Sequence, residues 1–242
     1  GNTGTFRIDD ITVTVQVVHD LGITRIHNAP PLPVELDTVW AVATVKNVGL
    51  AQASSFLVRF YDDVNYDSIP QPSELVGAVT NSDSLDVGDS IEVSMQLGRF
   101  MPGIKNIIAQ VVEAQDQNPA NDQLMSVLAI GYSPRSVVVN EIMYAPTGTE
   151  PEWVELYNAR ADGINLKNWL VSDNIVSSKK VISSSSIIIP PNGYIVLTKD
   201  SAALLDVHPT IASRVVNVTG FPTLNNSGDA VVLYDDRVAT MD

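Results

Sequence analysis

The feature that most constrains this chain is a two-residue alternation of apolar and polar side chains, broken at short intervals by turn residues. It is clearest at 137–158, where VVVNEIMY and EWVELYN flank a polar loop with two prolines and a glycine. In the second run Val154 and Leu156 share the face opposite to Trp153. Because successive side chains of a strand point to opposite faces, the pattern predicts strands with one buried face.

Runs of the same kind recur through the first half of the chain. They lie at 20–26, 38–49, 54–63, 75–80, 89–98, 105–114 and 122–130. Turn residues separate them, and we find no amphipathic helix of useful length. About seven short strands in roughly 110 residues indicate an antiparallel Ig-like sandwich.

The predicted fold is all-β, with two tandem Ig-like antiparallel β-sandwich domains at 18–131 and 136–242. Residues 132–135 form a short, proline-containing linker between them. Residues 1–17 hold one further alternating run. We interpret it as a strand or linker, with the remnant of an upstream domain as one of the alternatives.

The C-terminal segments also carry a family resemblance. After VVVNEIMY and EWVELYN come LKNWLVSD at 166–173, IIIPPNGYIVL at 187–197 and LNNSGDAVVLYD at 224–235. In this order they resemble the lamin tail domain, an Ig-like module of nuclear lamins and of many bacterial surface and secreted proteins. The resemblance implies a binding and spacer module without shared chemistry. The family pattern continues with one more short strand, so the last sheet edge is expected to be truncated or supplied by residues outside this sequence.

A second resemblance covers most of 20–130. The phrases DLGI, VKNVG, SSFLVRFYDD, LDVGDS and NPANDQ are similar in order to a CARDB-type, cell-adhesion-related bacterial domain. This family is likewise a non-enzymatic ectodomain module. Together the two resemblances imply an extracellular or cell-surface bacterial location and a protein or glycan partner.

The composition excludes several classes of function. The formal net charge is -14, from 28 acidic and 14 basic residues, and the densest basic spot is only Lys179-Lys180, so nucleic acid is not an expected partner. The absence of cysteine excludes disulfides, zinc–thiolate sites and thiol nucleophiles. No apolar run approaches the roughly 18–20 residues of a membrane-spanning helix.

The segment 63–74 is the strongest candidate for a ligand site. Oxygen-bearing groups follow the spacing of an EF-hand calcium loop, in which a hard cation is surrounded by side-chain and carbonyl oxygens. The candidate ligands are Asp63, Asn65, Asp67, Ile69 (through its carbonyl), Gln71 and Glu74. Ser68 replaces the usual turn glycine, and the flanks resemble strands. Two interpretations stay open: a weak structural calcium site with a Kd of about 10⁻⁴–10⁻³ M, and an acidic, proline-rich hairpin loop without metal.

The other reactive side chains form no recognisable catalytic pattern. Glu141, Glu152 and Glu155 lie within alternating strands, where hydrogen bonding or exposure is expected in place of acid–base chemistry. The histidines have no second ligand at metal spacing. They are His19, His27 and His208. We therefore predict that the chain is not an enzyme.

The aromatic residues are few, and most are expected in cores. Trp40, Trp153 and Trp169 each fall within an apolar strand run, which predicts core packing. Tyr61 and Tyr66, beside the acidic loop, are the pair to consider as a platform for sugar stacking, with packing as the alternative.

The predicted function is that of a non-catalytic tandem β-sandwich fragment of a larger exported or cell-surface bacterial protein. It would act as an adhesion or spacer module that contacts protein or glycan, with calcium stiffening one loop. The alternative is a pair of ancillary, substrate-docking domains of a secreted hydrolase or nuclease whose catalytic domain lies outside this sequence.

Overall fold

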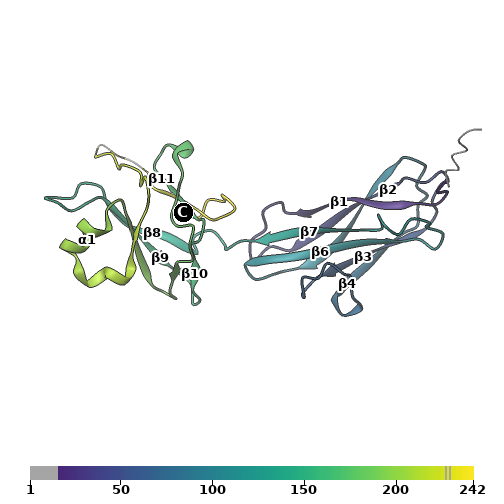
Figure 1. Cartoon of the computed structure of the whole chain (residues 1–242), viewed down its shortest axis with the longest axis horizontal. Helices are drawn as coiled ribbons and strands as arrows, with labels where there is room; N and C mark the ends of the chain where they lie inside the picture. The colour runs from purple at the N-terminus through teal and green to yellow at the C-terminus, as the bar shows by residue number, and fades with distance from the viewer. Residues whose placement is uncertain (1–15, 227, 229) are drawn as a thin grey trace, which may run out of the picture. The chain divides into compact units, whose positions relative to one another are not determined.

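The computed structural model describes residues 16–226, 228 and 230–242 and divides into two compact units (Figure 1). Unit 1 contains the described residues up to Pro31, together with Thr38–Arg99 and Ile104–Ala129. Unit 2 contains Leu32–Asp37, Phe100–Gly103 and Ile130–Asp242. The alternating run predicted within residues 1–17 lies, up to residue 15, outside the described residues.

Unit 1 is a sandwich of two antiparallel sheets, as predicted. One sheet has the order β1 (Leu21–Ala29), β2 (Val39–Asn47), β5 (Ser90–Gly98). The other has the order β4 (Leu75–Asn81), β3 (Phe56–Asp62), β6 (Gly103–Val112), β7 (Gln123–Ile130). A short 3₁₀ helix, η1 (Pro72–Glu74), precedes β4.

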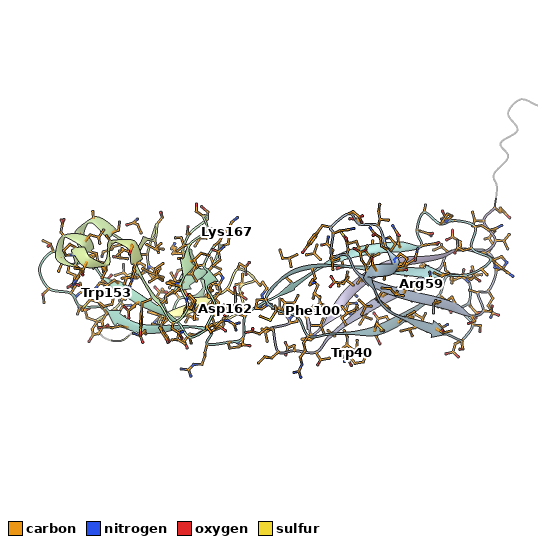
Figure 2. All side chains as sticks on the ribbon, turned by 90° about the horizontal axis from the view of Figure 1, so that it is seen from below. Trp40, Arg59, Phe100, Trp153, Asp162 and Lys167 are labelled. Carbon is orange, nitrogen blue, oxygen red and sulfur yellow. The ribbon has the colours of Figure 1, made fainter. Side chains whose placement is uncertain are left out.

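The alternation in β2 shows how the sequence sets this core. Val39, Ala41 and Val45 are buried on one face of the strand. Trp40 has the opposite phase and is 40% exposed, projecting outward from β2 (Figure 2). The prediction that Trp40 lies in the core was therefore wrong, because the period of two places it on the outer face of a strand whose inner face is already filled.

A buried asparagine ends β2. Asn47 is 1% exposed, and its Nδ2 donates to the carbonyls of Ala51 and Leu85, both at 2.9 Å. Its Oδ1 accepts from the N–H of Gly49 at 3.1 Å. A Cβ at Gly49 would lie 2.6 Å from the Val18 carbonyl oxygen, so only glycine fits at this turn. The VKNVG phrase thus holds one end of the sandwich in two ways, through the Asn47 side chain and through the turn at Gly49.

Unit 2 is built from three sheets. The largest has the order β15 (Val215–Asn217), β14 (Tyr194–Thr198), β9 (Trp153–Asn158), β8 (Val137–Met143). The second has the order β12 (Lys180–Val181), β11 (Leu170–Ser172), β16 (Val232–Tyr234), and the third pairs β10 (Ile164–Asn165) with β13 (Ile188–Ile189). Two 3₁₀ helices, η2 (Val176–Ser178) and η3 (Pro209–Arg214), lie in the connections.

One connection contains a short helix that the sequence patterns did not predict. Strands β14 and β15 pair in parallel, so the chain must cross over between them, and α1 (Ser201–Val207) lies in that crossover. The Asp200 side chain caps α1 by accepting from the N–H of Ala203 at 3.0 Å. Figure 1 shows α1 beside the sheet that contains β8 and β9. No helix among the described residues is long and apolar enough to cross a membrane.

The core of unit 2 surrounds Trp169. This indole is 2% exposed and lies 6.1 Å from the ring of Tyr132, measured between centroids. Val154 and Leu156 of β9 are fully buried in the same core, so one face of β9 is buried, as the alternation predicts. Trp153 was predicted to pack in a core, but it lies on the other face and is only half-buried.

A second buried asparagine ends β9. Asn158 has no exposed surface, and its Nδ2 lies within hydrogen-bond distance of three carbonyls. These belong to Asp162 at 2.8 Å, Ile189 at 3.1 Å and Pro190 at 3.0 Å. Its Oδ1 accepts from the N–H of Arg160 at 3.0 Å. One amide group therefore holds the strand end and two loops together.

Replacing the two tryptophans with alanine should have very different effects. Trp169→Ala removes a fully enclosed ring and should lower the free energy of unfolding of unit 2 by about 3–5 kcal/mol. Trp40→Ala, on an outer face, should cost about 1 kcal/mol or less. Urea denaturation of the full chain followed by far-UV circular dichroism measures both, and equal costs would contradict the burial assignment.

Candidate functional site

The predicted calcium loop is closed by its own first carboxylate. Asp63 is 1% exposed and accepts backbone N–H bonds from Asp67 at 3.2 Å and Ser68 at 3.1 Å. Tyr66 and Ser68 have positive φ angles of 60° and 62°, which turn the backbone toward Asp63. Ser68 thus takes the left-handed conformation that a glycine would supply in an EF-hand loop.

Three other predicted ligands gather around Asp67. Its Oδ2 accepts from Asn65 Nδ2 at 3.0 Å and from Gln71 Nε2 at 2.9 Å. Its Oδ1 accepts from the N–H of Ile69 at 2.8 Å. The structure therefore brings these residues together through hydrogen bonds within the loop. Across the described ranges, no group of three or more His, Asp or Glu side chains is arranged to hold a metal ion.

The last predicted ligand differs from the others. Glu74 is 5% exposed, and its Oε1 accepts from the N–H of Val64 at 3.2 Å, but its Oε2 is buried without a hydrogen-bond partner. Asp62 Oδ1 is in the same state, while its Oδ2 pairs with Lys105 Nζ at 2.8 Å. A buried carboxylate oxygen without a hydrogen-bond partner is destabilising, so a group that paired with it would stabilise the loop.

The strand carboxylates make structural contacts. Glu155 accepts from Asn140 Nδ2 at 2.8 Å, and Glu152 lies 3.6 Å from Lys199 Nζ. Glu141 is exposed on β8 and lies opposite Glu155 in the strand register. Cross-strand bonding accounts for Glu155 and exposure accounts for Glu141, as expected. Glu152 differs, because it precedes β9, is 9% exposed and buries Oε2 without a hydrogen-bond partner.

Glu150 was not singled out from the sequence, yet it joins two predicted residues. Its Oε1 accepts from Trp153 Nε1 at 2.9 Å and lies 2.9 Å from His208 Nε2. The indole bond, and then the bond to His208, lower the pKa of Glu150. The remaining histidines, His19 and His27, belong to unit 1 and are half-buried.

Tyr61 and Tyr66, the candidate pair for sugar stacking, do not form a joint exposed platform. Tyr61 is 5% exposed, and its hydroxyl donates to Gln110 at 3.1 Å. Tyr66 is 59% exposed, and its hydroxyl donates to the carbonyl of Ile104 at 3.1 Å. Because only one of the two rings reaches solvent, the packing alternative holds for Tyr61.

Unit 1 contains a buried polar cluster that no sequence pattern predicted. Asp20 is 6% exposed and accepts from Asn118 Nδ2 at 3.0 Å and Asn121 Nδ2 at 2.8 Å. Asp116 accepts from the N–H of Leu21 at 2.7 Å. These bonds tie the start of β1 to the loop between β6 and β7. The NPANDQ phrase marks that loop in the sequence, but only as a turn.

The carboxylates in and around this buried cluster repel one another. Burial chiefly, and then the charges of Asp116 and Asp20, raise the pKa of Asp122 to about 6. Burial also raises the pKa of Glu113, with His19 opposing and Asp116 adding to the shift. The cluster therefore holds negative charge at neutral pH at a cost in stability.

The pH dependence of unit 1 should reveal this cost. Because folding raises the pKa of Asp122, its ionised form is less favourable in the folded state, and stability should fall as pH rises from about 4 to about 6. Asp122→Asn should therefore stabilise unit 1 at pH 7.5 by on the order of 1 kcal/mol, a value discounted for solvent screening. Thermal unfolding at pH 5 and pH 7.5 measures the gap between variant and wild type. The gap should narrow at pH 5, and a pH-independent gap would contradict the assignment.

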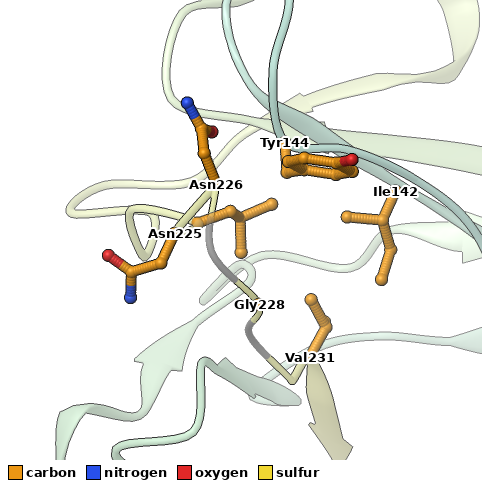
Figure 3. A pocket seen from close by; sticks show the side chains of 7 residues that line it. Ile142, Tyr144, Asn225, Asn226, Gly228 and Val231 are labelled. Carbon is orange, nitrogen blue, oxygen red and sulfur yellow. The ribbon is translucent and has the colours of Figure 1, made fainter.

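A pocket of about 470 Å³ lies in unit 2, where β8 runs out beside the segment that precedes β16 (Figure 3). Its described lining residues are Ile142, Tyr144, Leu224, Asn225, Asn226, Gly228 and Val231. Ile142 is 39% exposed and Tyr144 is 49% exposed, whereas Leu224 is buried. The pocket thus combines buried and exposed apolar side chains with an exposed aromatic ring, and no sequence pattern indicated it.

Comparison with solved structures gives similarities at low scores. A domain of a putative cell surface protein from Methanosarcina acetivorans is 20% identical, with a TM-score of 0.38 over 47% of this chain and 92% of that one. The CARDB domain of a Pyrococcus furiosus protein, solved in complex with di-metal ions, is 19% identical, with a TM-score of 0.38 over 50% of this chain and 100% of that one. Red sea bream transglutaminase is 16% identical, with a TM-score of 0.35 over 76% of this chain and 26% of that one.

Sequence comparison is more specific for unit 2. No curated protein matches the chain. The family described as Lamin Tail Domain matches residues 131–242, which contain β8 to β16, the buried Trp169 and Asn158. The C-terminal part of the chain, residues 131–242, is therefore a lamin tail domain.

Proposed function

We propose that the chain is a non-catalytic, tandem β-sandwich part of a larger exported, cell-surface bacterial protein. Unit 1 is a CARDB-type domain in this proposal, and the lamin tail domain follows it. The pair serves as a spacer and as a module that contacts protein or glycan.

The hydrogen bonds that the carboxylates make support this proposal most directly. Asp63 closes a loop through backbone N–H bonds, Asp20 ties β1 to a loop, and Glu150 orients an indole. Side chains with acid–base capacity are thus engaged in holding strands and loops. The same observation fits the alternative, in which the two units dock substrate for a secreted hydrolase or nuclease domain elsewhere in the parent protein.

The location can be tested on whole cells of the organism that encodes the chain. An antibody raised against the lamin tail domain should label intact cells, with an antibody against a cytosolic enzyme as the negative control. Labelling that appears only after the cells are lysed would contradict the proposed surface location.

A second part of the proposal is that the loop at 63–74 takes calcium weakly. The supporting observation is the buried, unpartnered Oε2 of Glu74 at the position of the closing ligand. Binding would require Asp63 and Asp67 to exchange hydrogen bonds within the loop for metal contacts, which agrees with a Kd of about 10⁻⁴–10⁻³ M. The role would be structural, stiffening the connection between β3 and β4.

Calcium should therefore raise the thermal midpoint of the wild-type chain. At about ten times its Kd, a ligand adds roughly 1.4 kcal/mol of stability, which corresponds to a shift of a few degrees. Glu74→Gln should abolish the shift while keeping the side-chain shape, and Glu92→Gln, at an exposed site on β5, is the matched control. Thermal unfolding with calcium and with magnesium measures the effect. Indifference of the wild type to millimolar calcium would leave the loop as a turn without metal.

A further inference from the structure

We propose that a pocket on the outer face of the sheet containing β8 and β9, in the lamin tail domain, receives one lysine or arginine side chain of a partner protein. The inference rests on the proposed function and deepens it, because it assigns the protein contact to one site and one chemistry. The pocket brings together Glu141, Trp153, Glu155 and His208, which come from two strands and from the segment after α1.

The pocket lies between the sheet and the segment formed by α1 and η3. Trp153 and Glu155 alternate along β9 with the buried Val154 and Leu156, so they project from its outer face. The volume is about 310 Å³, at the lower end of the range of about 300–1,000 Å³ for ligand sites, which suits a single side chain. The lining residues are Glu141, Trp153, Glu155, Val196, Leu204, His208, Thr210 and Ile211.

Two glutamates in this pocket face each other without a cation. The strand register places Glu141 opposite Glu155, and like charges at directly opposed positions are destabilising. Glu155 accepts a hydrogen bond from the neutral amide of Asn140 at 2.8 Å. Within the described part of the chain neither glutamate forms an ion pair, and no lysine or arginine lines the pocket. A cationic group between the two carboxylates would therefore replace repulsion by attraction.

The indole wall of the pocket is held in place before any ligand arrives. Trp153 Nε1 donates to Glu150 Oε1 at 2.9 Å, and the same oxygen lies 2.9 Å from His208 Nε2. These two bonds lower the pKa of Glu150, so its carboxylate is ionised at neutral pH and adds negative charge beside the pocket. Indole is the best aromatic partner for a cation, and a wall that is already positioned needs no ordering on binding.

The apolar part of the lining favours an amino-acid side chain over a bare metal ion. Val196 and Leu204 are buried, at 7% and 1% exposure, and offer contact to the methylene stem of lysine or arginine while the charged head meets the carboxylates. A calcium ion needs six to eight oxygens, and two glutamates supply fewer. The net charge of -14 also attracts a basic partner at long range.

The test titrates the full chain with Nα-acetyl-lysine amide and with Nα-acetyl-arginine amide. Nα-acetyl-norleucine amide, which keeps an unbranched apolar stem and lacks the charge, is the control ligand. The measured signal is the indole N–H resonance of Trp153, assigned by its loss in Trp153→Phe. We expect saturable shifts with both cationic probes, at a Kd of about 1–10 mM because each probe is small, and none with the norleucine probe. Added salt should weaken the binding.

Carboxylate variants locate the binding. Glu141→Gln and Glu155→Gln keep the side-chain size, and each should raise the Kd about fivefold or more, because each removes one negative charge from the pocket. Asp206→Asn is the matched control, since Asp206 is an exposed carboxylate of α1 that does not line the pocket. This variant should stay within about twofold of the wild type. Thermal unfolding of each variant guards against loss of fold.

Four results would overturn the proposal: no saturable shift with either cationic probe, an equal response to the norleucine probe, binding that survives both glutamate variants unchanged, or a calcium-induced shift of the Trp153 signal that the probes cannot displace. The last result would assign the pocket to a metal ion. Surface labelling of intact cells is independent of these titrations. A labelled cell surface without binding of the cationic probes would remove the pocket site and leave the surface module in place.

Discussion

A buried side-chain amide at the end of one strand is the interaction on which each unit depends. Asn47 ends β2 in unit 1 and Asn158 ends β9 in unit 2, and both are almost wholly enclosed. Each donates to carbonyls of loops that come from elsewhere in the chain and accepts from the N–H of a residue two positions on. Without these amides, the loop carbonyls would each lose a buried hydrogen bond, and the side chains that replaced the amides could not hold the loops to the strand end.

The acidic residues contribute to the fold in a similar way. Their excess gives the chain its charge, yet many of them accept hydrogen bonds that hold strands and loops. Some of the buried carboxylates are not fully paired. Burial, and then the charges of Asp116 and Asp20, raise the pKa of Asp122. Asp62 and Glu74 each bury one oxygen without a hydrogen-bond partner.

The fold class could be predicted because the strands of a sandwich show a local alternation of apolar and polar residues. The alternation in β2 and β9 gives the buried face of each strand directly. The phase of a residue in the strand matters as much as its type. Trp40 lies in an apolar run, which predicted core packing, but its phase places it on the outer face of β2. The two-residue strands β10 and β13 are too short to show a period.

Residues that come together from distant parts of the sequence show no comparable pattern. Asp20 bonds to Asn121 across 101 positions of sequence, and Tyr144 and Val231 line one pocket although they are far apart in the sequence. Asp and Asn are common in turns, and Tyr and Val are common in strands, so neither set stands out in the sequence. The loop at 63–74 was the reverse case, since its spacing suggested ligands whose observed bonds are mainly to one another. The spacing in the sequence predicts which side chains of a loop lie close together, but the loop conformation determines which groups they bind.

The central claim is that the buried acidic groups serve the fold. Thermal unfolding of Asp63→Ala beside Glu141→Ala tests it most directly, because Asp63 is buried and accepts backbone N–H bonds, whereas Glu141 is exposed on β8. We predict that Asp63→Ala lowers the thermal midpoint by several degrees and that Glu141→Ala leaves it almost unchanged. Equal midpoints for the two variants would contradict the account.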